Sequence, residues 1–225
     1  MSRTRSDRRQ TNTRRLVIFD HDGLMVNSED VVFAALHTIF QRFGHEFVWD
    51  YYVTSVGMPV VDSIAMFLRD LPIPLANDAF TVERNALVAD YFATRLELMP
   101  GLVPLLDYLR ERETPMAVAT SATREHLSHN LERFGPASYF QAAVCIDDVA
   151  RGKPHPDLIL EALGRTGFAP EDAIMLEDAP LGVEAARRAG VFCVAVPTRG
   201  IDLARFAAAD LIARDLFAVR TIMGG

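Results

Sequence analysis

Four stretches of the chain place acidic, hydroxyl or basic side chains directly after an apolar run, or a short loop beyond one. In chain order these side chains are Asp20 and Asp22, Thr120 and Ser121, Lys153, and Glu177 and Asp178. Carboxylates that lie close together repel one another unless a cation neutralises them. Their oxygens are hard ligands, which suit Mg²⁺ better than Zn²⁺. A divalent cation, an ammonium group and a hydroxyl group form a pocket for a phosphate dianion, beside which a carboxylate can act as nucleophile.

Lysine is used once in this chain. Of the 23 lysine and arginine residues, 22 are arginine and one is Lys153. A codon-biased genome would explain the arginines but not the exception. An ammonium group is a compact point charge on a flexible stem, whereas a guanidinium group is planar and broad. The exception therefore indicates a site that requires an ammonium group.

The charge of the chain is unevenly distributed. The net charge is −7, but residues 1–15 hold six arginines and one aspartate, so that segment carries +5 and the remainder −12. An acidic body argues against nucleic acid as the main partner. We interpret residues 1–14 as a basic, flexible tail.

Composition also narrows the cellular setting. No apolar run approaches the roughly 18 residues of a membrane-spanning helix, and the N-terminus lacks the apolar stretch of a secretory signal. The two cysteines, Cys145 and Cys193, lie in apolar runs and are expected to be buried thiols in a reducing compartment. We therefore expect a cytoplasmic protein without a membrane partner, and a monomer.

Six short apolar runs predict strands, at 16–20, 116–120, 143–146, 173–176, 193–196 and 211–213. They lack the in–out alternation of a half-exposed strand, which favours a parallel sheet buried on both faces. Helical stretches separate the later runs, at 125–134, 156–164 and 182–189. The predicted fold class is therefore α/β, with a doubly wound, Rossmann-like parallel sheet.

The segment 29–98 has no convincing strand, and its apolar residues follow helical spacing. We predict a helical domain inserted directly after the first strand, so that 15–28 and 99–225 form the α/β core. In open parallel sheets, ligands bind outside the carboxyl ends of the strands. The four chemically active stretches are therefore expected to meet at that edge.

These stretches resemble the haloacid dehalogenase-like superfamily, in its branch with a helical cap after the first strand. The matching pieces are FDHDGL at 19–24, AVATS at 117–121, GKPHPD at 152–157 and LEDAPLGV at 176–183. Within this branch the chain resembles β-phosphoglucomutase-like and pseudouridine-5'-phosphatase-like phosphatases, and its cap is similar to that of pseudouridine-5'-phosphatase and glycerol-phosphate phosphatase relatives. The resemblance implies a hydrolase that removes phosphate from a small phosphorylated metabolite.

The resemblance also implies roles around Mg²⁺. Asp20 would attack phosphorus, forming an aspartyl phosphate, and would ligate the metal with its other oxygen. Asp22 would protonate the leaving oxygen and then deprotonate the attacking water, while its backbone carbonyl reaches the metal. Asp178 would complete the metal site, together with Glu177 either directly or through water.

Phosphate binding is implied for a second set of residues. Thr120 would donate a hydrogen bond to a phosphoryl oxygen, although Ser121 offers an alternative hydroxyl group. Lys153 would neutralise the phosphate, and the backbone amides at Gly23 and near Ser121 would cradle it. His21 is expected to point away from its neighbours in the strand, as a packed or hydrogen-bonded structural histidine. The remaining histidines show no metal-ligand spacing.

Two other functions share part of this pattern. A sugar-phosphate mutase would carry a histidine where this chain has Val32 and an arginine in the loop 57–60, and both are missing. A phosphate-accepting signalling module uses a similar aspartate, hydroxyl and lysine, but lacks the second acid, Asp22, and the helical insertion. Both features favour turnover of the phosphoenzyme over its persistence.

Overall fold

The structure is a computed structural model, and it describes residues 15–225. The expectation of a flexible basic tail at 1–14 lies outside the described residues. Within the described part of the chain, no helix is long and apolar enough to cross a membrane.

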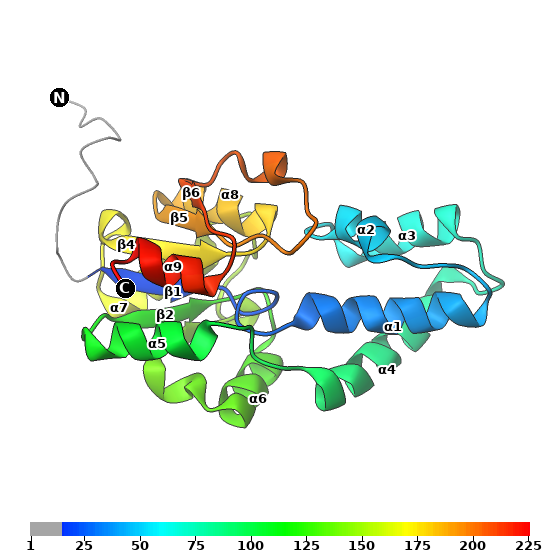
Figure 1. Ribbon diagram of the computed structural model, residues 1–225, viewed down its shortest axis with the longest axis horizontal. Coiled ribbons are helices and arrows are strands. Elements are labelled where there is room, and N and C mark those ends of the chain that lie inside the picture. Colours follow the sequence, from blue (N-terminus) through cyan, green and yellow to red (C-terminus); the bar gives the residue numbers. More distant parts are fainter. Residues whose placement is uncertain (1–14) are drawn as a thin grey trace.

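One parallel sheet of six strands forms the centre of the molecule (Figure 1). The strands are β1 (Leu16–Phe19), β2 (Met116–Ala119), β3 (Ala142–Val144), β4 (Ala173–Glu177), β5 (Phe192–Ala195) and β6 (Leu211–Ile212). Their order across the sheet is β3-β2-β1-β4-β5-β6, and each adjacent pair is parallel. The chain winds outward from β1 to β3 and then crosses to β4 on the other side of β1. The carboxyl end of β1 is therefore the topological switch point, where open sheets bind their ligands.

Helices cover both faces of this sheet. The helices of the α/β part are α5 (Leu102–Glu111), α6 (Arg124–Phe134), α7 (Asp157–Thr166), α8 (Pro180–Ala189) and α9 (Leu216–Ile222). Leu16 and Ile18 of β1 share one apolar cluster with α7 and α8, whereas Val17 and Phe19 share another with α5, α6 and α9. Both faces of β1 are thus buried, which is why its sequence shows no polar alternation.

The inserted segment is helical, as the spacing of its apolar residues predicts. It comprises α1 (Ser28–Arg42), α2 (Trp49–Tyr52), the 3₁₀ turn η2 (Val53–Ser55), α3 (Val60–Asp70) and α4 (Asn77–Arg95). In Figure 1 these helices form a lobe beyond one end of the sheet, with α1 and α4 side by side. We call this lobe the cap. The predicted limits, 29 and 98, lie one to three residues from the ends of its first and last helices, and the division into domains stays a prediction.

The two segments that connect the cap to the core run antiparallel to each other and are hydrogen-bonded. Val26 forms an antiparallel bridge with Leu98. The amide of Asn27 donates to the carbonyl of Glu97 at 3.0 Å, and the amide of Glu97 donates to Oδ1 of Asn27 at 2.8 Å. The cap therefore joins the core immediately after the loop that follows β1.

Four further 3₁₀ turns complete the described core, namely η3 (Pro136–Tyr139), η4 (Ile146–Asp148), η5 (Pro170–Asp172) and η6 (Leu203–Phe206). Both cysteines are buried and unpaired by a disulfide, as expected from their apolar surroundings.

Candidate active site

Lys153 and three carboxylates meet at the carboxyl ends of the central strands. Nζ of Lys153 donates to Oδ1 of Asp20 at 2.5 Å and to Oε2 of Glu177 at 3.2 Å. Asp20 directly follows β1 and Glu177 ends β4, so the pairing of β1 with β4 sets their distance. Lys153 comes from the loop between η4 and α7. Its side chain is 7% exposed, so the ammonium group is buried against its partners.

Asp178 completes this group. Ligand oxygens of Asp20, Glu177 and Asp178 all lie within 4.8 Å of one another. Two glycines leave the room that these side chains need. A Cβ atom at Gly23 would lie 2.0 Å from Oδ2 of Asp178, and one at Gly182 would lie 1.7 Å from Oε1 of Glu177. Gly23 also has φ +81°, in the left-handed region that glycine adopts without strain.

Charge and burial are in conflict in this cluster. Burial raises the pKa of Asp20, and the ammonium of Lys153 opposes that shift without cancelling it. Burial and then the neighbouring negative charges raise the pKa of Glu177 and of Asp178. Burial would lower the pKa of Lys153, but the charges of Asp20 and Glu177 outweigh it and raise that pKa above its usual value. Three buried acids thus share one ammonium group, so without a further cation the site disfavours ionisation of all three.

A divalent cation fits the chemistry of these donors. Every side-chain ligand in the group is a carboxylate oxygen, and there is no sulfur or imidazole among the three. Oxygen-only sites with two or more carboxylates select Mg²⁺ over softer metals. Asp20, Glu177 and Asp178 are therefore the residues that would hold Mg²⁺.

Thr120 lies at the end of β2, next to β1 in the sheet. Its side chain is buried, and Oγ1 accepts a hydrogen bond from the amide of Ala122 at 3.1 Å. The hydroxyl proton of Thr120 remains to be donated elsewhere, as a phosphate ligand requires. Ser121 is exposed at the rim, beside Gly152. The position of Thr120 agrees better with the predicted contact to phosphate.

The side chain of Asp22 does not join the carboxylate group. Its Oδ1 lies 3.1 Å from Nδ1 of His21 and 3.2 Å from Nε2 of His126. Burial would raise the pKa of Asp22, but hydrogen bonds from His126 and then His21 outweigh it and hold that pKa well below its ordinary value. Asp22 is close enough to Asp20 for its charge to raise the pKa of Asp20.

The two histidines differ in how well the sequence predicts them. His21 is buried and hydrogen-bonded, as expected, but it lies beyond β1 and contacts Asp22 instead of pointing away from it. Strand alternation ends at Phe19, so it does not govern His21. The role of His126 was missed. It lies 104 residues from Asp22 in the chain and is brought there by the first turn of α6, and no local spacing indicates this contact.

The cap contains a cavity of about 120 Å³. Glu29, Tyr52 and Arg84 supply its most polar lining. The hydroxyl of Tyr52 donates to Oε2 of Glu29. Burial raises the pKa of Glu29, and the charge of Asp22 adds to that shift, so the cavity lies within electrostatic reach of the catalytic loop. Sequence reasoning did not single out Glu29 or Arg84.

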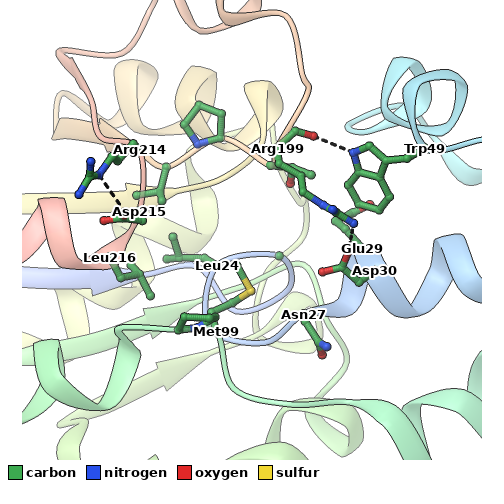
Figure 2. A pocket seen from close by; sticks show the side chains of 15 residues that line it. Leu24, Asn27, Glu29, Asp30, Trp49, Met99, Arg199, Arg214, Asp215 and Leu216 are labelled. Atoms are coloured by element: carbon green, nitrogen blue, oxygen red, sulfur yellow. Dashed lines mark hydrogen bonds and ion pairs between the residues drawn. The ribbon is translucent and has the colours of Figure 1, made fainter.

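A second cavity, of about 220 Å³, lies where the cap meets the core loop 196–199 (Figure 2). There the indole Nε1 of Trp49 donates to the carbonyl of Arg199 at 2.9 Å, and Nη2 of Arg199 donates to Oδ1 of Asp30 at 2.8 Å. The metal-type carboxylates do not line this cavity. These contacts join the cap to the core at a second place, in addition to the two connecting segments around Asn27 and Glu97.

Comparison with known proteins places these observations in a family. The profile of the haloacid dehalogenase-like hydrolases matches residues 17–196. This chain belongs to the haloacid dehalogenase-like hydrolases. The prediction made from the four stretches is thereby confirmed, and the predicted α/β fold agrees with the solved relatives described below. A signalling module is not supported, which leaves the mutase as the alternative.

Several relatives are phosphatases. The chain is 33% identical over 208 residues to (DL)-glycerol-3-phosphatase 2 of Arabidopsis thaliana, covering 89% of this chain and 86% of the relative. It is 33% identical over 212 residues to validoxylamine A 7'-phosphate phosphatase of Streptomyces hygroscopicus subsp. limoneus, covering 92% and 96%. A probable pseudouridine-5'-phosphatase of Saccharomyces cerevisiae is 31% identical over 195 residues, covering 80% and 81%. These relatives bear out the expectation of a hydrolase that acts on phosphate monoesters.

Solved structures show the same fold. A Thermotoga maritima protein provisionally assigned as a β-phosphoglucomutase is 25% identical, with a TM-score of 0.76 over 93% of this chain and 98% of that one. A haloacid dehalogenase-like protein of Agrobacterium tumefaciens, 20% identical, has a TM-score of 0.83 over 94% and 98%. The second comparison supports the fold alone.

Proposed function

We propose that this haloacid dehalogenase-like hydrolase is a Mg²⁺-dependent phosphatase that hydrolyses a small phosphorylated metabolite through an aspartyl phosphate at Asp20. The observation that carries the proposal is the buried group of Asp20, Glu177 and Asp178 around the ammonium of Lys153. Such a group is costly in a protein interior without a cation to neutralise it, and the cation together with Lys153 can then bind an anionic phosphoryl group.

Asp20 is the nucleophile in this proposal. It lies at the switch point of the sheet, where substrate phosphorus can approach from the open carboxyl edge. The Asp20 carboxylate attacks phosphorus, the bond from phosphorus to the ester oxygen breaks, and an aspartyl phosphate forms. Lys153 favours the ionised form of Asp20 and neutralises phosphoryl charge, while Thr120 donates its hydroxyl proton to a phosphoryl oxygen. Bound Mg²⁺ would supply further neutralisation of charge on the transferring phosphoryl group.

Asp22 transfers protons in both steps. Because the hydrogen bonds from His126 and His21 favour its ionised form, Asp22 must take up a proton when the anionic substrate binds beside it. That proton passes to the leaving alkoxide as the ester bond breaks, and the carboxylate then takes a proton from the water that attacks the aspartyl phosphate. A persistent phosphoenzyme would need no such group. Asp22 therefore supports hydrolysis of the intermediate.

The cap cavity is the place for the alcohol part of the substrate. Its polar lining holds one cation, Arg84, beside the acid Glu29, and the lining loop has Met58 where a basic residue could have bound a second phosphate. This balance favours an uncharged, hydroxyl-bearing leaving group over a bisphosphate. The relatives named for glycerol 3-phosphate and validoxylamine 7'-phosphate are consistent with a polyol-like alcohol.

Val32 supports hydrolysis over isomerisation. It lines the cap cavity, at the position where the resemblance to mutases calls for a histidine. Val32 has no group that could transfer a proton between sugar and phosphoenzyme. Release of free phosphate from a sugar 1-phosphate, without formation of the isomer, would separate the two activities.

The proposal is tested with p-nitrophenyl phosphate. Hydrolysis is expected to require Mg²⁺, to cease with EDTA and to return when Mg²⁺ is restored. Asp20→Asn should abolish turnover while the variant keeps its fold by circular dichroism. A fully active Asp20→Asn enzyme would contradict the covalent mechanism.

A screen of phosphorylated metabolites with the wild-type enzyme would identify the class of its natural substrate.

We also propose that the protein acts as a monomer in the cytoplasm, without nucleic acid as a partner. The free thiols of Cys145 and Cys193 support a reducing compartment. Light scattering after size-exclusion chromatography measures the mass in solution, and a dimer would overturn the monomer.

A further inference from the structure

His126 contacts the proposed proton-transferring residue from outside the motifs of the site. It lies in the first turn of α6, where the hydroxyl of Thr123 caps the helix by accepting from the amide of His126 at 3.4 Å. Its Nε2 faces Oδ1 of Asp22 at 3.2 Å. The imidazole ring packs against Phe92 of α4, with ring centroids 5.3 Å apart, and Nε2 also lies 3.2 Å from the side-chain Nδ2 of Asn130. The ring is thus held from the cap side and from its own helix.

His21 contacts the same oxygen from the other side. Nδ1 of His21 is 3.1 Å from Oδ1 of Asp22, and the rings of His21 and His126 meet edge to face with centroids 5.6 Å apart. Against the ionised carboxylate both imidazoles act as donors. Oδ2 of Asp22 has no hydrogen bond to a described residue, so one oxygen is held and the other is left for a reacting group.

This arrangement matters because the Asp22 side chain is about a third exposed. An aspartate carboxyl group turns broadly about its last torsion, and an exposed one samples several orientations. A proton transfer of catalytic value requires the carboxyl oxygen within hydrogen-bond reach of the ester oxygen. Two donors on one oxygen restrict that torsion and fix the direction of Oδ2.

We propose that His126 is a positioning residue that, with His21, holds Oδ1 of Asp22 so that Oδ2 is directed to the leaving group. The inference rests on the proposed function. In the step concerned, Oδ2 of Asp22 has taken up a proton on binding of the anionic substrate while Oδ1 still accepts from the two imidazoles. The Asp20–phosphorus bond then forms, the phosphorus–ester oxygen bond breaks, and that proton passes from Oδ2 to the departing oxygen. His126 touches neither substrate nor phosphorus, and it acts through Asp22.

The leaving group of the substrate provides the test. A series of aryl phosphates, from p-nitrophenyl to unsubstituted phenyl phosphate, changes the need for a proton while the reacting centre stays the same. p-Nitrophenolate leaves without protonation, whereas phenolate benefits from it. The value of kcat/KM reports steps up to formation of the phosphoenzyme, so it isolates the acid step from the later hydrolysis.

His126→Phe should lower kcat/KM for phenyl phosphate by about 10- to 100-fold, since general acid catalysis contributes about 100-fold or more when intact. For p-nitrophenyl phosphate the loss should be at most about threefold. The dependence of rate on leaving group should therefore steepen toward that of Asp22→Asn. The double variant should be no steeper than Asp22→Asn alone, because both changes remove one function.

Two further variants exclude a merely structural effect. His129→Phe makes the same change at an exposed position of α6 and should keep the wild-type dependence. His126→Gln retains an N–H donor at similar reach and should restore most of the loss.

Equal losses for all esters in His126→Phe, or an unchanged leaving-group dependence, would overturn the inference. A wild type that hydrolyses none of the esters would instead overturn the proposed function.

Discussion

At the residue scale, the site depends on close approaches that leave no room for a different side chain. Nζ of Lys153 donates to two carboxylates, and the missing side chain of Gly182 leaves the space that the Glu177 carboxylate fills. A point substitution at Lys153 or at Gly182 tests whether the site depends on these contacts.

Lys153→Arg is expected to lower kcat/KM by about 100-fold or more, the loss typical of a preorganised charged group at a phosphoryl centre. The planar guanidinium cannot occupy the space of Nζ between Asp20 and Glu177 without displacing one of them. The matched change is Arg151→Lys, two residues before Lys153 in the chain. It alters an exposed ion pair between Arg151 and Asp157 and should leave kcat/KM unchanged. A Lys153→Arg enzyme with near wild-type kcat/KM would show that the ammonium is not required.

Gly182→Ala should abolish Mg²⁺-dependent activity. Its Cβ would overlap Oε1 of Glu177 at 1.7 Å, so the Glu177 carboxylate must move away from Lys153. Gly164→Ala is the control, because a Cβ at this helical position meets nothing within 4 Å. That variant should keep full activity and gain about 0.5–1 kcal/mol in unfolding free energy, measured by urea denaturation. Equal activity in the two variants would contradict the assigned packing of Glu177.

At the element scale, the loop that carries Lys153 is held by an ion-pair network behind it. Asp148, in η4, accepts from the amide of Cys145 at 2.9 Å and pairs with Arg165 of α7 at 2.8 Å and with Arg124 of α6. The Asp148 side chain is only 10% exposed. Burial would raise its pKa, but the hydrogen bond from Arg165 and those from Cys145 outweigh it and lower that pKa below the usual value. The network fixes the turn between β3 and α7.

Asp148→Asn should reduce the unfolding free energy at pH 7 by about 1–3 kcal/mol, the usual loss when a buried charged hydrogen-bond partner is removed. Because the pKa of Asp148 is lower in the folded state, its contribution is complete above the unfolded-state pKa. It is lost as the pH falls from that value toward the folded-state pKa.

The gap in stability between wild type and Asp148→Asn should therefore narrow between pH 7 and about pH 3. Urea unfolding at both pH values measures it. A gap that stays constant, or widens in acid, would contradict the assigned network.

The sequence predicted the strands well because each is a nearly continuous apolar run. The carboxyl ends of two strands differ from the predicted ends. β3 ends at Val144 instead of 146, because the chain turns into η4 at Cys145, whose amide donates a hydrogen bond to Asp148. β4 extends to Glu177, which pairs in register with Ala195 although it is charged.

The site was predictable as far as strand order and motif position could bring residues together. Asp20, Lys153 and Glu177 meet because their strands are neighbours or nearly so. His126 and Arg84 were not predictable, because they reach the site from helix faces whose orientation depends on tertiary packing. The spacing of residues within a short segment does not predict that packing.

At the scale of the whole molecule, the buried acids of the site cost stability near neutral pH until a cation binds, because their pKa values are raised in the folded protein. Asp178 lies fully within the core, and its oxygen accepts a hydrogen bond from Thr198 at 3.3 Å. A carboxyl group whose pKa is raised on folding costs stability at neutral pH, so removing it stabilises the metal-free protein, whereas it weakens the site for Mg²⁺.

Asp178→Asn should therefore raise the Tm measured in EDTA and lose the increase in Tm that Mg²⁺ gives the wild type. Asp172→Asn, at an exposed position just before β4, should behave as wild type in both conditions. Scanning calorimetry with and without Mg²⁺ provides the measurement. A wild type whose Tm does not respond to Mg²⁺ would argue against the metal site.

The most direct test is to trap the phosphoryl group on the protein. Asp22→Asn, mixed with p-nitrophenyl phosphate and Mg²⁺, should release about one equivalent of p-nitrophenolate rapidly and then stall, because the good leaving group needs no acid but the intermediate still needs a base. Acid quenching, borohydride reduction and peptide mass spectrometry should then place the modification at Asp20. Absence of a burst, or a phosphoryl group on any other residue, would contradict covalent catalysis by Asp20.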